Sequence, residues 1–142
     1  MATNTPDQLP GCTYHLLDTG IHQITFTSVS PNAMDELFVH LNAIFDGKTH
    51  DDPRLLILID GSAVGFPSLN RVMVGGKNLV DRHPDRPPVR YALVFDGSVR
   101  HIVSALEKVI RLFRGTNEVR SFRPQEREEA EAWLLRNVVR TT

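Results

Sequence analysis

The tripeptide Asp-Gly-Ser occurs twice in the chain, each time directly after an apolar run. Asp60-Gly61-Ser62 follows residues 55–59, and Asp96-Gly97-Ser98 follows residues 92–95. Each tripeptide leads toward a predicted helix, as in a βα unit. Because the ends of parallel strands meet at one edge of a sheet, we expect both tripeptides at the same edge. The unpaired N–H groups of the two helix N-termini there, at Pro67 and Ser98, could bind a small anion, and Arg100 would add positive charge.

The candidate binding or regulatory residues lie in the two loops at this edge. They are Asp60, Ser62, Phe66, Ser68, Asp96, Ser98 and Arg100. A structural interpretation remains open beside the anion site. Ser30 and Ser98 can serve only as N-caps, while Asp60 and Asp96 stabilise tight turns.

The opposite edge is more acidic and carries two histidines. Its weak candidates for a divalent metal site are His50, Asp52, His83 and Asp85. Imidazole and carboxylate groups can bind such ions, but these four residues lack any recognised ligand spacing. We therefore expect no metal, and the sequence implies no other cofactor.

The sequence contains no recognised catalytic motif. It lacks a nucleophile elbow, a dinucleotide-binding fingerprint and a paired zinc-ligand motif. Cys12 precedes the first predicted strand, where a free thiol more often serves as a small apolar side chain than as a nucleophile. We therefore predict no catalytic residues and a non-enzymatic function.

Length and composition are typical of one cytoplasmic domain. The chain has 142 residues, 41% of them hydrophobic and 23% charged, with a net charge of −1. This charge gives no general attraction to nucleic acid. A single cysteine precludes an intramolecular disulfide and favours a reducing compartment. The first twelve residues do not resemble a signal peptide, and no apolar run approaches the roughly 20 residues that span a bilayer.

Hydrophobic periodicity predicts alternating strands and helices. A hairpin is expected over residues 13–17 and 21–26, with Gly20 in its turn, followed by a helix over 31–46 that ends at Gly47. A central strand over 55–60, a helix from Pro67, a strand over 89–95 and a helix after Ser98 follow. A short strand over 119–122 and a helix from Pro124 complete the pattern. Gly75-Gly76 in the second helix predicts close approach to a neighbouring element.

This order predicts an α/β fold: a mostly parallel five-stranded sheet with four helices, whose first strand is an antiparallel edge. The domain is expected over residues 13–139, with a flexible tail at 1–12 and a short C-terminal tail at 140–142. The central strand is apolar throughout and requires cover on both faces. The last helix, the N-terminal segment or a second subunit in a homodimer could supply the second cover.

Residues 56–66, LILIDGSAVGF, resemble the strand and loop before the second helix of the SpoIIAA-like fold of STAS and related domains. Residues 119–122 and the following Trp133-Leu134 helix are similar to the end of the family's uncharacterised members. The resemblance implies a regulatory or protein-interaction domain, with specificity from residues 60–69 and 96–100. Phosphorylatable members carry an Asp-Ser/Thr-Ser/Thr-Gly type motif, whose phosphoacceptor position falls on Leu69 here. We therefore expect no phosphorylation switch of the family's type.

Two other functions remain open. The fold also resembles lipid-binding Sec14-like domains, which implies a small-molecule or lipid carrier with an apolar cavity between helices and sheet. Phe38, Phe66, Met73 and Phe113 could line such a cavity, although their spacing also suits an ordinary core. An unidentified enzyme is the third possibility.

Overall fold

The structure is a computed structural model that describes residues 11–28, 31–64, 69–97, 103–105, 107–108, 110 and 117–136. Several predictions from the sequence lie outside these residues. They concern residues 1–10 of the N-terminal tail, the C-terminal tail, the N-cap Ser30, and the site candidates Phe66, Ser68, Ser98 and Arg100. The predicted anion site at the helix N-termini near Pro67 and Ser98 lies outside them as well. Residues 11 and 12, which the sequence assigned to the flexible tail, are described and buried.

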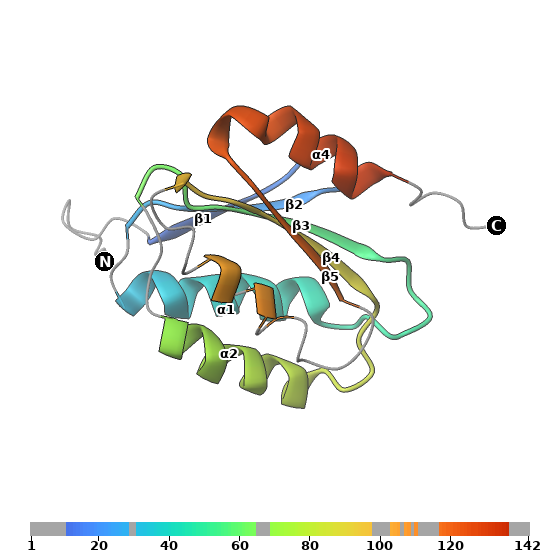
Figure 1. Ribbon diagram of the computed structural model, residues 1–142. Coiled ribbons are helices and arrows are strands. Elements are labelled where there is room, and N and C mark those ends of the chain that lie inside the picture. The colour runs from blue at the N-terminus through green and yellow to red at the C-terminus, as the bar shows by residue number, and fades with distance from the viewer. Residues whose placement is uncertain are drawn as a thin grey trace, which may run out of the picture.

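The described chain follows the predicted order of strands and helices (Figure 1). Its elements are β1 (Cys12–Leu16), β2 (His22–Phe26), α1 (Pro31–Phe45), β3 (Leu55–Asp60), α2 (Leu69–Arg82), β4 (Val89–Val94), β5 (Glu118–Phe122), the 3₁₀ turn η2 (Pro124–Glu126) and α4 (Arg127–Leu135). Between β4 and β5, the described residues 103–105, 107–108 and 110 are helical, in the predicted third helix. The fourth helix does not begin as an α-helix at Pro124. A 3₁₀ turn comes first, in which the Glu126 carboxylate accepts the Arg123 N–H at 2.8 Å.

The five strands form one sheet in the order β1-β2-β3-β4-β5. β1 pairs with β2 in antiparallel fashion, and the three remaining pairs are parallel. The α/β prediction is therefore confirmed, including the antiparallel edge hairpin. Because right-handed crossovers add strands in one direction, the crossover helices collect on one face. α1 and α2 lie side by side on that face, below the sheet in Figure 1.

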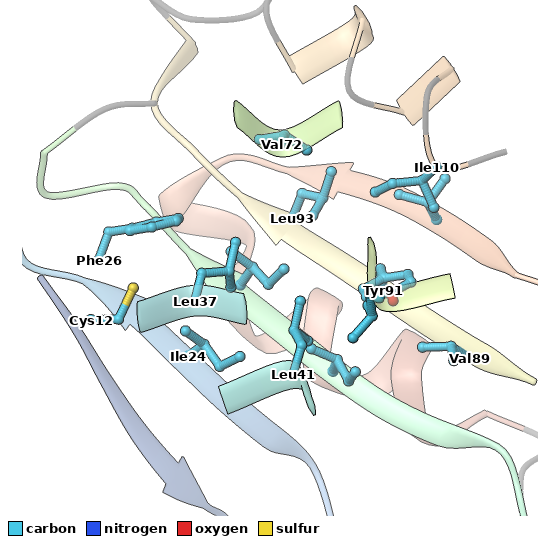
Figure 2. Close-up of a cluster of buried hydrophobic side chains, with 14 of the residues drawn as sticks. Cys12, Ile24, Phe26, Leu37, Leu41, Val72, Val89, Tyr91, Leu93 and Ile110 are labelled. Carbon is cyan, nitrogen blue, oxygen red and sulfur yellow. The ribbon is translucent and has the colours of Figure 1, made fainter. Parts of the chain in front are cut away.

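The larger core lies between this face and the helices (Figure 2). Ile57 of β3 and Leu93 of β4 belong to this core and have no exposed area. Leu37 and Leu41 reach it from α1, and Val72 from α2. Val103 and Ile110 of the third helical segment belong to the same cluster, so at these two described positions the segment predicted after Ser98 packs against the sheet.

α4 covers the other face of the sheet, over β3, β4 and β5 (Figure 1). Leu56 and Leu58 of β3 pack there with Ala130 and Leu134 of α4, and Leu58 and Leu134 have no exposed area. The central strand is therefore buried on both faces, as its uninterrupted apolar run predicts. Of the three covers that the sequence left open for β3, the structure shows the last helix.

Arg90 of β4 fixes the C-terminal end of α4. Its Nη1 atom donates to the carbonyls of Trp133, Leu134 and Arg136 at 3.0, 3.3 and 2.7 Å. The guanidinium group also lies 5.3 Å from the centre of the Trp133 ring. The Trp133 carbonyl also accepts the Arg136 N–H at 3.2 Å. A cation beside these carbonyls opposes the negative end of the helix dipole.

Glycines occupy the positions that the turns require. Gly20 in the hairpin and Gly47 after α1 have φ values of 94° and 76°, a region that other residues rarely adopt. Gly75 has a different role, because a Cβ atom at this position would overlap the ring of Phe38 in α1. The close approach predicted from the glycine pair is confirmed at Gly75.

Replacing Gly75 with Ala should destabilise the protein. Alanine normally favours a helix over glycine by about 1 kcal/mol, but overpacking against Phe38 should reverse the sign and cost about 1–3 kcal/mol. Asn78→Ala in the same helix is the control, since Asn78 is exposed. Urea denaturation should show a lower midpoint for Gly75→Ala only. An unchanged or higher midpoint would contradict the packing role.

Candidate functional site

The two Asp-Gly-Ser tripeptides end neighbouring strands, because β3 and β4 pair in parallel with Asp60 opposite Val94. This confirms that the two loops begin at one edge of the sheet. The two aspartates nevertheless have different surroundings. Asp60 lies on the face that α4 covers, whereas Asp96 lines a groove of about 520 Å³ with Ser104, Glu107 and Ser121. Ser121 donates a hydrogen bond to Glu107 in this groove.

Asp60 binds its own loop through one carboxylate oxygen. Oδ1 accepts the backbone N–H of Ser62 at 2.9 Å and the Ser62 hydroxyl at 2.6 Å. This is the Asx-turn geometry in which an aspartate side chain replaces a backbone acceptor. The structural interpretation, in which Asp60 stabilises a tight turn, is therefore confirmed for this residue.

The other Asp60 oxygen binds α4. Oδ2 accepts a hydrogen bond from Nη1 of Arg127 at 3.1 Å, and the Asp60 side chain is only 14% exposed. Arg127 also donates to Gln23 of β2 at 2.7 Å and to Glu131 at 3.0 Å. One guanidinium group thus joins two strands, the loop after β3 and the first turn of α4.

Sequence reasoning did not identify Gln23 or Arg127 as part of this site. One signal was present in the chain. A cation in the first turn of a helix faces the positive end of the helix dipole, so it needs carboxylate partners to be stable there. Asp60 and Glu131 supply them.

Asp60 and Ser62 are the described candidates that this network connects, while Asp96 lies outside it. Gly61 allows β3 and β4 to approach closely where the loop begins. A Cβ atom at Gly61 would overlap the buried ring of Phe95. The loop beginning therefore has a defined shape, with Ser62 held inward while Ala63 remains exposed.

The weak metal candidates at the opposite edge bind different partners. His50 contacts Asp85 and lies 3.1 Å from Asp51. Asp52 accepts the backbone N–H of Thr49 at 2.7 Å, and Nε2 of His83 pairs with Asn42 at 2.8 Å. Across the described ranges, no group of three or more His, Cys, Asp or Glu side chains is arranged to hold a metal ion.

Cys12 is buried beneath α1, where its thiol donates to the Ala33 carbonyl at 3.2 Å. Burial, together with the nearby Glu36 carboxylate, raises the pKa of the Cys12 thiol to about 12. The reactive thiolate is therefore scarce at neutral pH. The prediction that Cys12 serves as a small apolar side chain is confirmed.

An apolar cavity of about 60 Å³ lies between the sheet and the helices α1 and α2. Phe38 lines it as predicted, but Met73 does not and is 48% exposed. Phe66 and Phe113 lie outside the described residues. Pockets for drug-sized ligands hold roughly 300–1,000 Å³. The cavity that the described residues enclose therefore gives no support to the lipid carrier.

Removing the Arg127 side chain should destabilise the protein by about 1–3 kcal/mol, because Asp60 and Gln23 would lose a partner in a mostly buried site. Arg123→Ala is the matched control. Arg123 pairs with Glu126 at 3.3 Å but is 59% exposed, so its loss should cost less than about 1 kcal/mol. Equal losses for Arg127→Ala and Arg123→Ala in chemical denaturation would contradict the structural role of Arg127.

The pKa of His50 should depend on Asp85. The hydrogen bond to Asp85, followed by the charges of Asp51 and Asp85, raises the pKa of His50 above its usual value. The resulting stability is complete below the unfolded pKa of about 6.5 and disappears as pH rises through the raised folded value. An NMR titration of the His50 ring should show a lower pKa in Asp85→Asn. The His83 ring, which pairs with Asn42, is the internal control.

The sequence and the fold were compared with those of known proteins. A family model described as SpoIIAA-like matches residues 23–135. Among solved structures, the chain is similar to an uncharacterised protein of the DUF3478 family with a SpoIIAA-like fold, from Shewanella loihica PV-4. The two are 17% identical with a TM-score of 0.61, over 92% of this chain and 99% of that one.

No curated protein sequence shows a significant match to this chain. The family model nevertheless extends from β2 to the end of α4, and so includes the loop after β3 and the Arg127 network. The SpoIIAA-like fold is one of regulatory and interaction domains in general. This chain belongs to the SpoIIAA-like family.

Proposed function

We propose that this domain is a non-enzymatic regulatory module that binds a protein partner through residues 60–69 and 96–100. The observation that carries the proposal is the engagement of both Asp60 oxygens. They accept hydrogen bonds from Ser62 and Arg127 within the chain. A general base needs an acceptor directed at its substrate, whereas this carboxylate stabilises the shape of a surface loop.

The surroundings of Cys12, His22 and His83 also support a non-catalytic function. Burial raises the pKa of the Cys12 thiol far above neutrality. Nδ1 of His22 pairs with the Tyr14 hydroxyl at 2.7 Å, and His83 pairs with Asn42. These contacts hold the two imidazoles against a phenol and an amide, whereas the exposed His50 pairs with the carboxylate of Asp85.

A fixed loop shape suits recognition by a protein. The Arg127 network orders the start of the loop in the unbound protein, so that part of the chain loses less conformational entropy when a partner binds. Membership of the SpoIIAA-like family supports the same class of function.

We place the domain in the cytoplasm, which suits a chain whose lone cysteine is a buried free thiol. No described helix is long and apolar enough to cross a membrane.

Two variants, each with an exposed alanine replaced by arginine, test the proposed surface. Ala63 is exposed in the loop after Asp60, and Ala43 is exposed on α1. Ala63→Arg should displace the protein partner by placing a long cation on the loop, whereas Ala43→Arg should leave it bound. The measurement is quantitative mass spectrometry of proteins cross-linked to the tagged wild type and both variants in the native host.

Circular dichroism should first show that both variants fold. Partners lost only from Ala63→Arg would support the proposal. Partners retained equally by all three chains would place docking elsewhere. A wild type that cross-links to no protein above the tag-only control would contradict the interaction function itself.

A further inference from the structure

The two edges of the sheet differ in how they are protected against pairing with another strand. β5 carries Glu118 and Arg120, and charged side chains on an edge strand discourage further pairing. β1 reads Cys-Thr-Tyr-His-Leu, with no Asp, Glu, Lys, Arg or Pro. Its register with β2 runs without a bulge from Cys12 opposite Phe26 to Leu16 opposite His22.

The ladder shows which backbone groups of β1 point away from the sheet. Leu17 donates its N–H to Ile21 at 2.9 Å, and Thr27 donates to Gly11 at 2.8 Å. Hydrogen-bonded positions alternate along an antiparallel pair. Thr13 and His15 therefore direct their backbone groups toward β2, while Cys12, Tyr14 and Leu16 direct theirs outward.

The side chain of Glu36 occupies one end of this outer edge. Its Oε1 atom accepts the N–H groups of Gly11 and Cys12 at 2.8 and 3.0 Å. No described residue pairs with the outward backbone groups of Tyr14 or Leu16. These two residues also have exposed apolar side chains, 38% for Tyr14 and 53% for Leu16. Apart from the outward carbonyl of Cys12, the free hydrogen-bonding groups of β1 thus belong to the two residues with exposed apolar side chains.

We propose that β1 pairs in antiparallel fashion with β1 of a second copy of this chain, with Tyr14 opposite the partner's Leu16. The two-fold axis then passes beside His15. Each Tyr14 exchanges both of its outward hydrogen bonds with the partner's Leu16. Every free group of these two residues is satisfied, and the contact of Glu36 with Cys12 stays intact.

The same register brings complementary side chains together. The even-numbered side chains of β1 lie on the α1 face. There the ring of Tyr14 stacks on the ring of His40, with 5.6 Å between the ring centres. Each exposed Leu16 would pack beside the partner's Tyr14, and cross-strand pairs of an aromatic and an aliphatic residue stabilise antiparallel sheets. The surface is therefore self-complementary, as a two-fold interface requires. This argues for a second copy over an unrelated strand.

The test compares the wild type with Leu16→Lys and with Val74→Lys as the matched control. Val74 is 57% exposed on α2, so both changes place a lysine at a similarly exposed apolar position. Sedimentation velocity over a concentration series should show a dimer for the wild type and for Val74→Lys. Leu16→Lys should weaken dimerisation at least about tenfold, because lysines on the joined strands repel and fail to pack.

Amide hydrogen exchange gives a second readout that does not depend on a variant. The N–H groups of Tyr14 and Leu16 should become protected as protein concentration rises, whereas those of Thr13 and His15 are protected at all concentrations by β2. A wild type that stays monomeric at millimolar concentration would overturn the proposal. A dimer that persists in Leu16→Lys while the amides of Tyr14 and Leu16 stay unprotected would also overturn it. The same holds for a monomer in which these two amides become protected only when a strand of another protein binds.

Discussion

The structure depends on burying both faces of β3. Its first five residues are all buried, and Ile57 and Leu58 point to opposite faces with no exposed area. Burying one such side chain stabilises the folded state by about 1.5–3 kcal/mol, so exposing either face would destabilise a small domain severely. Because the sheet grows in one direction from β2 to β5, its crossover helices cover only one face. α4 must therefore return across the opposite face.

Polar contacts give this cover helix a defined position. Leu134 and Ala130 supply the apolar contact, but a flat apolar surface would tolerate sliding. Arg127 at the first turn binds Asp60, and Arg90 binds the carbonyls of the last turn. These two arginines fix α4 along its axis. The same Arg127 contact shapes the loop proposed for partner recognition, so the core and the candidate site share one interaction.

α4 spans nine residues, about 14 Å of helix, and does not reach the whole sheet. It packs on β3, β4 and β5 and reaches β2 through the hydrogen bond of Arg127 to Gln23, while Thr13 and His15 of β1 stay exposed on that face. The residues there are polar, with Thr13 and His15 on β1 opposite Thr25 and Gln23 on β2. Cys12, Ile24 and Phe26 of the two strands pack toward α1, whereas Leu17 and Ile21 at the turn end of the hairpin belong to the cluster on the α4 face. This explains why its sequence lacks the continuous apolar run of β3 and why β1 ends the sheet as an exposed edge.

The sequence by itself determined the order of the elements, the antiparallel hairpin and the two-sided burial of β3. It also predicted the turn glycines and the close approach at Gly75. These features follow from periodicity and from the backbone preferences of single residues, which act over a few positions. The tertiary structure alone decided that α4 covers β3, that Asp60 and Asp96 have separate surroundings, and that His83 pairs with Asn42 rather than with His50. Each outcome depends on residues far apart in the chain; Asp60 and Arg127, for example, are 67 positions apart. Local pattern does not encode such pairings, because they arise only when the sheet register and the helix packing bring the side chains together.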